Sequence, residues 1–292
     1  MLIERLHSAA LPAGPRVRWF PAGRPGLGAL PEHVTLTGHG SWWADDPSEP
    51  RAAAVSCAGH AILAGDPRST DPEDLAPLAG HYVAAPDRFL PVLGAAFHRI
   101  VPWERMIWVR RDPPPAVRLA PGTSVRRLLP HDARALRTLG PDLAWAGAGW
   151  GGPTGLATTG LGWGAFRGGL LLSLACPLFL GSRYEDIAVA TLPQERGRGL
   201  ATACVRALCA DITARGRIPS WTCSRDNHPS RHLAAKSGFH PVHEYVHYAV
   251  GTRPGAPATP SDNRVNLPRE EVGSRGARSS AGWTRRPERT PG

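Results

Sequence analysis

The sequence predicts a mixed α/β fold, with a layered α/β domain in its C-terminal half and a smaller α/β domain before it. Three observations support this fold class. Strand-like apolar runs alternate with helical periodicity between residues 124 and 250, a run of prolines precedes them, and aliphatic residues become rare after residue 250. The expected order in the C-terminal half is β-α-β-β-β-α-β-α-β, which is typical of a mixed sheet flanked by helices.

The length of 292 residues allows two cores, and composition divides the chain into four parts. We expect an N-terminal domain of unknown role, a proline-rich linker, a main domain and a disordered basic tail. These parts cover, in order, residues 1–112, 113–123, 124–250 and 251–292. In the first part the stretches 52–63 and 105–109 are apolar, but no topology follows from them.

Composition also limits the class of protein. The apolar runs are far shorter than the ~20 residues of a membrane-spanning helix, and the N-terminus lacks the features of a secretory signal. We therefore expect a cytoplasmic protein that binds no membrane. The five cysteines form no CxxC pair, which argues against a zinc site or a disulfide framework. The net charge of +10 comes from scattered arginines, so nucleic acid is an unlikely partner.

The first half of the main domain is expected to contain three strands and one helix. The strands are expected at residues 124–129, 163–166 and 170–180. After the first strand, Asp132 is a plausible N-cap for a helix that buries Leu136. A connection rich in glycine and tryptophan follows. Gly168 and Gly169 then form a turn that joins the second and third strands as a hairpin.

The second half of the main domain is expected to alternate strands and helices. The strands are expected at residues 184–191, 220–223 and 242–250. After the first of them, apolar residues recur at every fourth position from Leu200 to Ile212, which is the stripe of an amphipathic helix. A shorter helix over 232–236, ended by Gly238, precedes the last strand.

The sharpest local motif is Arg-Gly-Arg-Gly-Leu-Ala, from Arg196 to Ala201, where a strand ends and the amphipathic helix begins. Gly197 and Gly199 allow positive φ and leave the amides open to a ligand, and a helix N-terminus offers unpaired N–H groups. The run lacks the lysine and hydroxyl of a nucleoside-triphosphate loop. It favours a pyrophosphate bound without a metal; an ordinary tight turn is the alternative.

These six residues resemble the R/Q-x-x-G-x-G/A motif of the GCN5-related N-acetyltransferase (GNAT) superfamily. The segment from Asn227 to Phe239 is similar to a second motif of that superfamily, N-x-x-[SA]-x-x-L-x-x-K-x-G-F. The two motifs agree in order and separation. The resemblance covers about residues 125–250, and it implies a GNAT-type mixed sheet with acetyl-CoA as cosubstrate.

The resemblance also implies residues that bind acetyl-CoA. The turn would bind the coenzyme A pyrophosphate through Arg196, Gly197, Arg198, Gly199, Leu200 and Ala201. Val189 and Thr191 would pair their backbones with the pantetheine arm, because the sheet of this superfamily splays there. Asn227 and Ser230 would contact the pantetheine or phosphate end, although an N-cap and a surface hydroxyl are equally structural roles for them.

An amine must lose a proton before it attacks a thioester, so a base is expected near the cosubstrate. Glu185 is the first candidate, because it lies eleven residues before Arg196. That is the spacing of the strand glutamate that serves as base in the histone-acetylating branch of the superfamily. Asp186 should point to the opposite face of the strand. Both carboxylates could instead be ordinary surface groups at a strand start.

The proton donor and the acceptor site are less defined. Many GNAT enzymes place a tyrosine as general acid where this chain has Ala234, so Tyr245, Tyr248 and water are the candidates here. The acceptor is expected beside the connection between the first helix and the second strand. Trp145, Trp150 and Gly151 could line a pocket there, or the tryptophans could belong to the core.

The expected function is transfer of an acetyl group from acetyl-CoA to a primary amine of an unidentified small molecule or protein. The alternative is a catalytically weak acyl-CoA-binding regulatory module, because Ala234 replaces the usual acid. The N-terminal region could select the substrate, pair two subunits as a homodimer, or be a degenerate second GNAT-like lobe.

Overall fold

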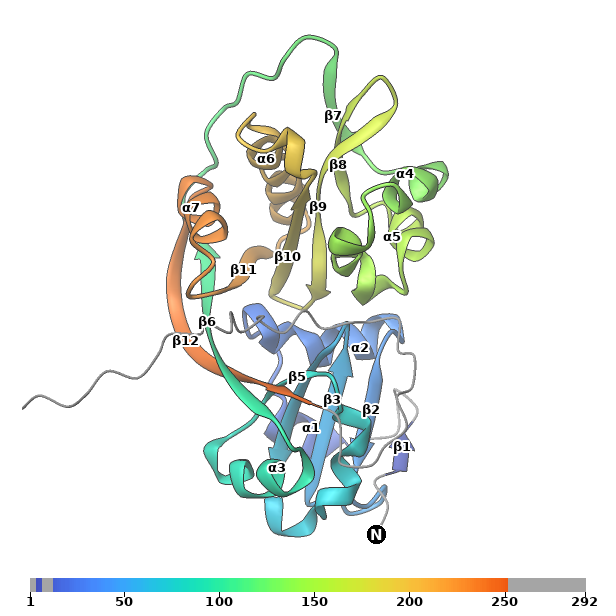
Figure 1. Cartoon of the computed structure of the whole chain (residues 1–292), viewed down its shortest axis with the longest axis vertical. Coiled ribbons are helices and arrows are strands. Elements are labelled where there is room, and N and C mark those ends of the chain that lie inside the picture. The colour runs from blue at the N-terminus through green and yellow to red at the C-terminus, as the bar shows by residue number, and fades with distance from the viewer. Residues whose placement is uncertain (1–3, 7–12, 252–292) are drawn as a thin grey trace, which may run out of the picture.

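The computed structural model describes residues 4–6 and 13–251 of the chain. Apart from Gly251, the expected basic tail lies outside the described residues. The described strands form one sheet of twelve, in which two lobes follow each other along the long axis of the molecule (Figure 1). Among the described helices, none has both the length and the apolar character that crossing a membrane would need.

The N-terminal half of the chain supplies one set of strands and helices. Its strands are β1 (Glu4–Leu6), β2 (Ser41–Ala44), β3 (Ala52–Cys57), β4 (His60–Gly65), β5 (Tyr82–Ala84) and β6 (Ile100–Arg110). Its helices are α1 (Ala13–Trp19), α2 (Leu30–Thr37) and α3 (Leu90–Ala96), with short 3-10 helices that include η1 (Gly26–Ala29) and η3 (Pro72–Leu78). No strand or helix covers residues 111–122, which connect the two halves.

The C-terminal half supplies a second, similar set. Its strands are β7 (Thr123–Arg127), β8 (Trp163–Arg167), β9 (Leu170–Leu180), β10 (Tyr184–Thr191), β11 (Ile218–Ser224) and β12 (Phe239–Val250). Its helices are α4 (Ala133–Arg137), α5 (Pro153–Thr159), α6 (Leu200–Ala214) and α7 (His228–Lys236), and the 3-10 helix η6 (Pro141–Trp150) precedes α5.

The predicted order of strands and helices in the C-terminal half is confirmed, with three differences. The helix α5 and the 3-10 helix η6 were not expected, because their glycine-rich sequence lacks an apolar stripe. The helix α7 begins at His228, since the Asn227 side chain caps it by accepting the Ser230 N–H at 3.1 Å. Asp132 occupies the N-cap position of α4 as predicted, but its carboxylate accepts the Leu129 N–H instead of an N–H of the helix.

Each half of the chain repeats one order of strand pairing. The strands β1 to β4 pair antiparallel in sequence order, and β4 then pairs parallel with β5. The strands β7 to β10 do the same, and β10 pairs parallel with β11. One difference separates the halves: α6 connects β10 to β11, whereas short 3-10 helices connect β4 to β5. The repeat favours the alternative that the N-terminal half is a second, degenerate lobe of the same kind.

The last strand of each half joins the sheet of the other half. The strand β6 lies between β11 and β12, and β12 lies between β6 and β5. Residues Arg105 to Val109 of β6 pair with β11, while Tyr248 and Ala249 of β12 pair with β5. Both strands run between the lobes on the left of Figure 1. Each lobe therefore depends on the other half of the chain for one strand of its sheet.

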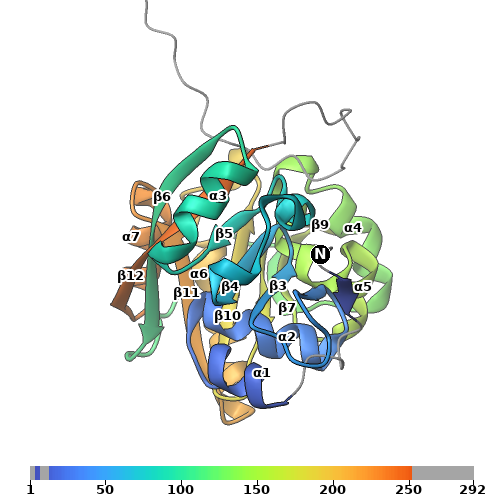
Figure 2. The same cartoon turned by 90° about the horizontal axis from the view of Figure 1, so that it is seen from below.

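Three apolar cores support this sheet. One core lies between the lobes and joins Leu30 on α2 and Trp42 on β2 to Leu156 on α5 and Leu174 on β9. The other two lie under α6 and under α3. Figure 2 shows α3 on one side of the N-terminal strands and α1 with α2 on the other. We call the sheet face toward the shared core the inner face and the opposite one the outer face.

The five cysteines are all buried with free thiols. They lie in the apolar cores, and burial raises the pKa of the Cys176 thiol to about 12. They therefore act as small apolar side chains.

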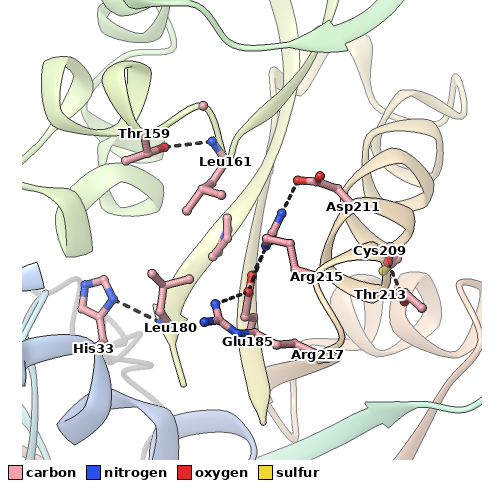
Figure 3. A network of polar contacts seen from close by, with 12 residues as sticks. His33, Thr159, Leu161, Leu180, Glu185, Cys209, Asp211, Thr213, Arg215 and Arg217 are labelled. Atoms are coloured by element: carbon pink, nitrogen blue, oxygen red, sulfur yellow. Dashed lines mark hydrogen bonds and ion pairs between the residues drawn. The ribbon is translucent and has the colours of Figure 1, made fainter. Parts of the chain in front are cut away.

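His33 on α2 connects the two lobes inside the shared core. Its Nδ1 accepts the Leu180 N–H at 3.1 Å (Figure 3), so its Nε2 carries the hydrogen and donates to the Gly149 carbonyl at 2.7 Å. The Trp150 ring meets it edge-on, with centroids 5.0 Å apart. The arrangement requires a neutral imidazole, and burial lowers the pKa of His33 to about 4.

Acidification should therefore weaken the fold through His33. Its pKa falls from 6.5 in the unfolded chain to about 4 in the folded one, so its stabilisation is complete above pH 6.5 and is lost as pH falls toward 4. Between pH 7 and pH 5 this amounts to about 2 kcal/mol. Urea unfolding at pH 7 and at pH 5 should show that the free energy of unfolding falls by about 2 kcal/mol less in His33→Gln than in the wild type.

The exposed His39, at the end of the same helix, supplies the control. Its charge makes only the smallest contribution to the low pKa of His33, so His39→Gln should keep most of the pH dependence of the wild type. An equal loss of stability in the wild type and in His33→Gln would contradict the assignment.

Candidate functional site

The glycine motif forms the expected turn at the start of α6. Gly197 and Gly199 adopt φ values of +76° and +77°, and Gly199 is the N-cap of the helix. A Cβ on Gly197 would meet no atom within 4 Å, so the space beside this amide is open. Gly199 is covered by Val117, whose Cγ1 would lie 2.6 Å from an added Cβ. The turn thus presents backbone amides and a helix N-terminus to an open surface.

The charged side chains of the turn suit an anion. Arg196 and Arg198 are both exposed beside Gly197. Arg198 is held by Glu195, with 3.1 Å between its Nη1 and the Oε2 of the glutamate. Arg196 is therefore the more available of the two guanidinium groups for a phosphate.

The strands β10 and β11 separate beside this turn. Their parallel pairing ends at Ile187 and Trp221, although β10 stays paired with β9 as far as Thr191. A bulge between Asp186 and Ile187 marks the point of separation. On the β11 side, the backbone of Val189 and Thr191 consequently has no partner among the described strands, and an extended ligand could pair with it.

The two polar residues expected at the other end of the cosubstrate have structural roles. Asn227 caps α7 with its side chain. The Ser230 hydroxyl accepts the indole N–H of Trp221 at 3.0 Å. These contacts favour the structural alternative for both residues, and their contact with coenzyme A stays a prediction.

The structure does not support Glu185 as the base. Its side chain is fully buried on the outer face, where the carboxylate receives Arg215 at 2.7 Å and Arg217 at 2.9 Å. Figure 3 shows these two guanidinium groups beside Glu185, with Asp211 bound to Arg215. These two ion pairs, between a buried carboxylate and partly exposed arginines, join the end of α6 to the start of β11 and leave no free oxygen on Glu185.

Asp186 has the surroundings of a base instead. It is 1% exposed on the inner face, and its Oδ1 accepts the hydroxyls of Thr222 at 3.1 Å and Ser220 at 3.2 Å. Burial raises its pKa to about 7, against the effect of the hydroxyls and of Arg105. The expectation that both carboxylates could be surface groups is wrong. The spacing to Arg196 does not fix which face of the strand each of the two side chains occupies.

The N-terminal lobe closes the inner face around Asp186. The Gly26 N–H of η1 donates to the Ser220 hydroxyl at 3.0 Å. A Cβ on Gly26 would lie 2.8 Å from both Ile107 and Thr222, so only glycine lets η1 approach this closely. Residues of the first half therefore position the hydroxyl that binds the carboxylate of Asp186.

Tyr245 lies on the same face of the sheet. It pairs with Arg105 across β12 and β6, and its hydroxyl is buried without a hydrogen-bond partner in the described part of the chain. Burial raises the pKa of its phenol, so the hydroxyl keeps its proton at neutral pH. This protonation state is the one that a proton donor needs.

The three residues expected at the acceptor site occupy different surroundings. Trp150 is 4% exposed in the shared core, and its indole N–H donates to the Pro177 carbonyl at 2.7 Å. The core alternative is therefore the one that applies to Trp150. Trp145 is 47% exposed and Gly151 ends η6 with φ +69°. Contact of Trp145 or Gly151 with an acceptor stays a prediction.

Comparison with known sequences gives one family and two relatives. A family model described as GNAT acetyltransferase matches residues 140–248. A Streptomyces virginiae protein described as an uncharacterized N-acetyltransferase in the mutA 5′ region is 57% identical over 206 residues, which is 70% of this chain and 86% of the relative. YdfB of Bacillus subtilis (strain 168), an uncharacterized N-acetyltransferase, is 32% identical over 102 residues, 35% of this chain and 39% of YdfB.

Solved structures share the fold at low sequence identity. A GCN5-related N-acetyltransferase-like protein from Streptococcus suis 89/1591 has a TM-score of 0.58 at 19% identity, covering 73% of this chain and 88% of its own. A GNAT-family acetyltransferase from Colwellia psychrerythraea has a TM-score of 0.56 at 13% identity, with coverage of 86% and 100%. A tandem GNAT protein from the clavulanic acid biosynthesis pathway has a TM-score of 0.51 at 15% identity, with coverage of 84% and 97%.

Proposed function

The chain belongs to the GNAT family of N-acetyltransferases, and from this premise we propose that it transfers an acetyl group from acetyl-CoA to a primary amine. The observation that carries the proposal is the separation of β10 from β11 directly beside the glycine turn of α6. One extended ligand with a pyrophosphate in its middle would satisfy both features. Acetyl-CoA has this form.

The residues present fit the cosubstrate. The open space at Gly197 admits the pyrophosphate to the amides at the start of α6, and the exposed guanidinium of Arg196 offers a counter-charge. The unpaired edge of Val189 and Thr191 would hold the pantetheine amides. The thioester would then lie near the bulge that follows Asp186.

We assign the base to Asp186. A pKa of about 7 lets its carboxylate be ionised in a large fraction of molecules at neutral pH and still accept a proton. The amine nitrogen attacks the thioester carbonyl carbon, the carbon–sulfur bond breaks, and the proton of the amine passes to Asp186. The thiolate of coenzyme A takes up a proton, for which the buried phenol of Tyr245 is the proposed source.

A pair of glycine variants tests the cosubstrate site. Gly197→Ala places a methyl group where the pyrophosphate would lie, so the Kd of acetyl-CoA in calorimetric titration should rise by about tenfold or more. Gly168→Ala in the β8–β9 turn is a matched control, because Gly168 also has positive φ, +56°, and open space around it. Its Kd should equal that of the wild type.

Thiol release from acetyl-CoA in the presence of amines then tests the reaction. Release with some amine supports the transferase. Binding of acetyl-CoA without release by any amine would favour the regulatory module that the replacement at Ala234 suggested. Absence of binding by the wild type, or equal Kd values for both alanine variants, would contradict the proposed site.

A further inference from the structure

The inner face between the lobes carries a group of polar side chains that the reaction above does not use in full. We call it the inter-lobe cluster, and it consists of His60 on β4, Arg105 on β6, and Tyr245 and His247 on β12. Tyr245 lies opposite Arg105, so their side chains share one face. The ring of His247 is 5.0 Å from that of Tyr245 and 5.3 Å from that of His60. Both halves of the chain thus contribute to it.

Polar atoms of this cluster are buried without partners. His247 is 0% exposed, and neither of its ring nitrogens has a hydrogen bond with a described residue. The same holds for Nδ1 of His60, the hydroxyl of Tyr245 and Nε of Arg105. A buried polar atom without a partner is destabilising, and native proteins leave few of them. Several in one place indicate that a polar ligand binds there.

The cluster offers more hydrogen-bond donors than acceptors. Burial lowers the pKa of His60 to about 3 and that of His247 well below its usual value, so each neutral imidazole has one N–H to donate. Arg105 stacks over Trp103 at 4.4 Å and takes part in none of the ion pairs of the described residues. A guanidinium that has no carboxylate partner within the described part of the chain, and that lies among neutral donors, is suited to a carboxylate.

We propose that the amine acceptor also carries a carboxylate, which binds to Arg105 and to the imidazoles of His60 and His247, while its amine lies at Asp186. The strand β11 lies between Asp186 on β10 and Arg105 on β6, and both residues lie on the inner face. Along β11, Asp186 is opposite Ser220 and Arg105 is opposite Ser224, four residues further on. An extended small molecule with its amine and its carboxylate at opposite ends can therefore reach both. This inference rests on the proposed function, and it makes the N-terminal lobe part of the substrate site through His60.

Thiol release with pairs of acceptors tests the inference. The full chain is assayed with acetyl-CoA and a panel of amino acids, each beside its own carboxamide, and with polyamines that have no carboxylate. The wild type should use the acids with kcat/KM about 10- to 100-fold above the amides, the usual effect of a hydrogen-bonded charge. Arg105→Gln should remove this preference, and Arg105→Lys should restore part of it.

Arg110→Gln is the matched control, because Arg110 lies on β6 with its side chain bound to Thr213 of α6 on the outer face. It should keep the preference, and urea unfolding should show that both glutamine variants are folded. If Arg105→Gln does not fold, the test rests on Arg105→Lys, whose preference for acids over amides should be smaller than that of the wild type. Equal use of acids and amides, or reaction of polyamines alone, overturns the inference and leaves the proposed function standing. Failure of the wild type to bind acetyl-CoA would contradict both the inference and the proposed function.

Discussion

Cutting the chain after Asp112 should leave neither piece able to fold alone. The piece 113–251 lacks β6, so β11 and β12 lose the strand that lies between them. The piece 1–112 lacks β12, which pairs with β5. Each piece also exposes its side of the shared core, including Trp42 or Leu174. Circular dichroism should show no native sheet signal, and urea should give no cooperative transition for either piece.

Co-expression of the two pieces should restore the fold. The cut lies where no strand or helix is present, so all pairings of β6 and β12 can re-form between the pieces. They should co-purify in equal amounts and unfold in one transition. A cooperative transition in the piece 113–251 on its own would contradict the strand exchange as a requirement for folding. It would support the two independent domains that the sequence predicts.

Asp186→Asn should lower kcat by about 10²- to 10⁴-fold, the usual contribution of a positioned base. The wild type should gain activity as pH rises through about 7, where Asp186 ionises, and the variant should lack this rise. The free energy of unfolding of the wild type should change in the opposite direction over this pH range. The folded pKa lies above the unfolded value of 3.8, so ionisation of Asp186 reduces stability as pH rises from 3.8 through 7. Asn removes that penalty above pH 7.

The neighbouring residue supplies the control for this prediction. Glu185→Gln leaves Arg215 and Arg217 without their buried counter-charge, which should reduce the free energy of unfolding by about 3 kcal/mol. Thiol release per folded molecule should fall much less than in Asp186→Asn. Stopped chemistry in Glu185→Gln with normal kinetics in Asp186→Asn would return the role of base to Glu185.

The sequence predicts the C-terminal half of the fold well because its signals are local. The bounds of β9 and β10 follow from their apolar runs, and the turn of α6 follows from two glycines at a strand end. The helix α5 was not predicted because its seven residues are too few to show an amphipathic stripe and depend on tertiary contacts. The strands of the N-terminal lobe could not be predicted either, because they are short and depend on their neighbours in the sheet.

The parts of the site that could not be predicted depend on contacts distant in sequence. Arg105 carries no motif, and its position opposite Tyr245 follows only from the pairing of β6 with β12. The choice between Glu185 and Asp186 as the base also depends on contacts distant in sequence. Our assignment rests on the contacts of each carboxylate, with Arg215 and Arg217 on one face and Ser220 and Thr222 on the other. No spacing along one strand reports these partners.

The exchange of β6 and β12 also restricts how substrates can enter. Many two-lobed enzymes open and close by rotation about a hinge. Here β6 and β12 pair at eleven positions and both run between the lobes, so a rotation that opened the inner face would have to bend this two-stranded ribbon and separate the shared core. We therefore expect a nearly rigid enzyme, in which movement of side chains and of the residues that connect the strands admits the acceptor.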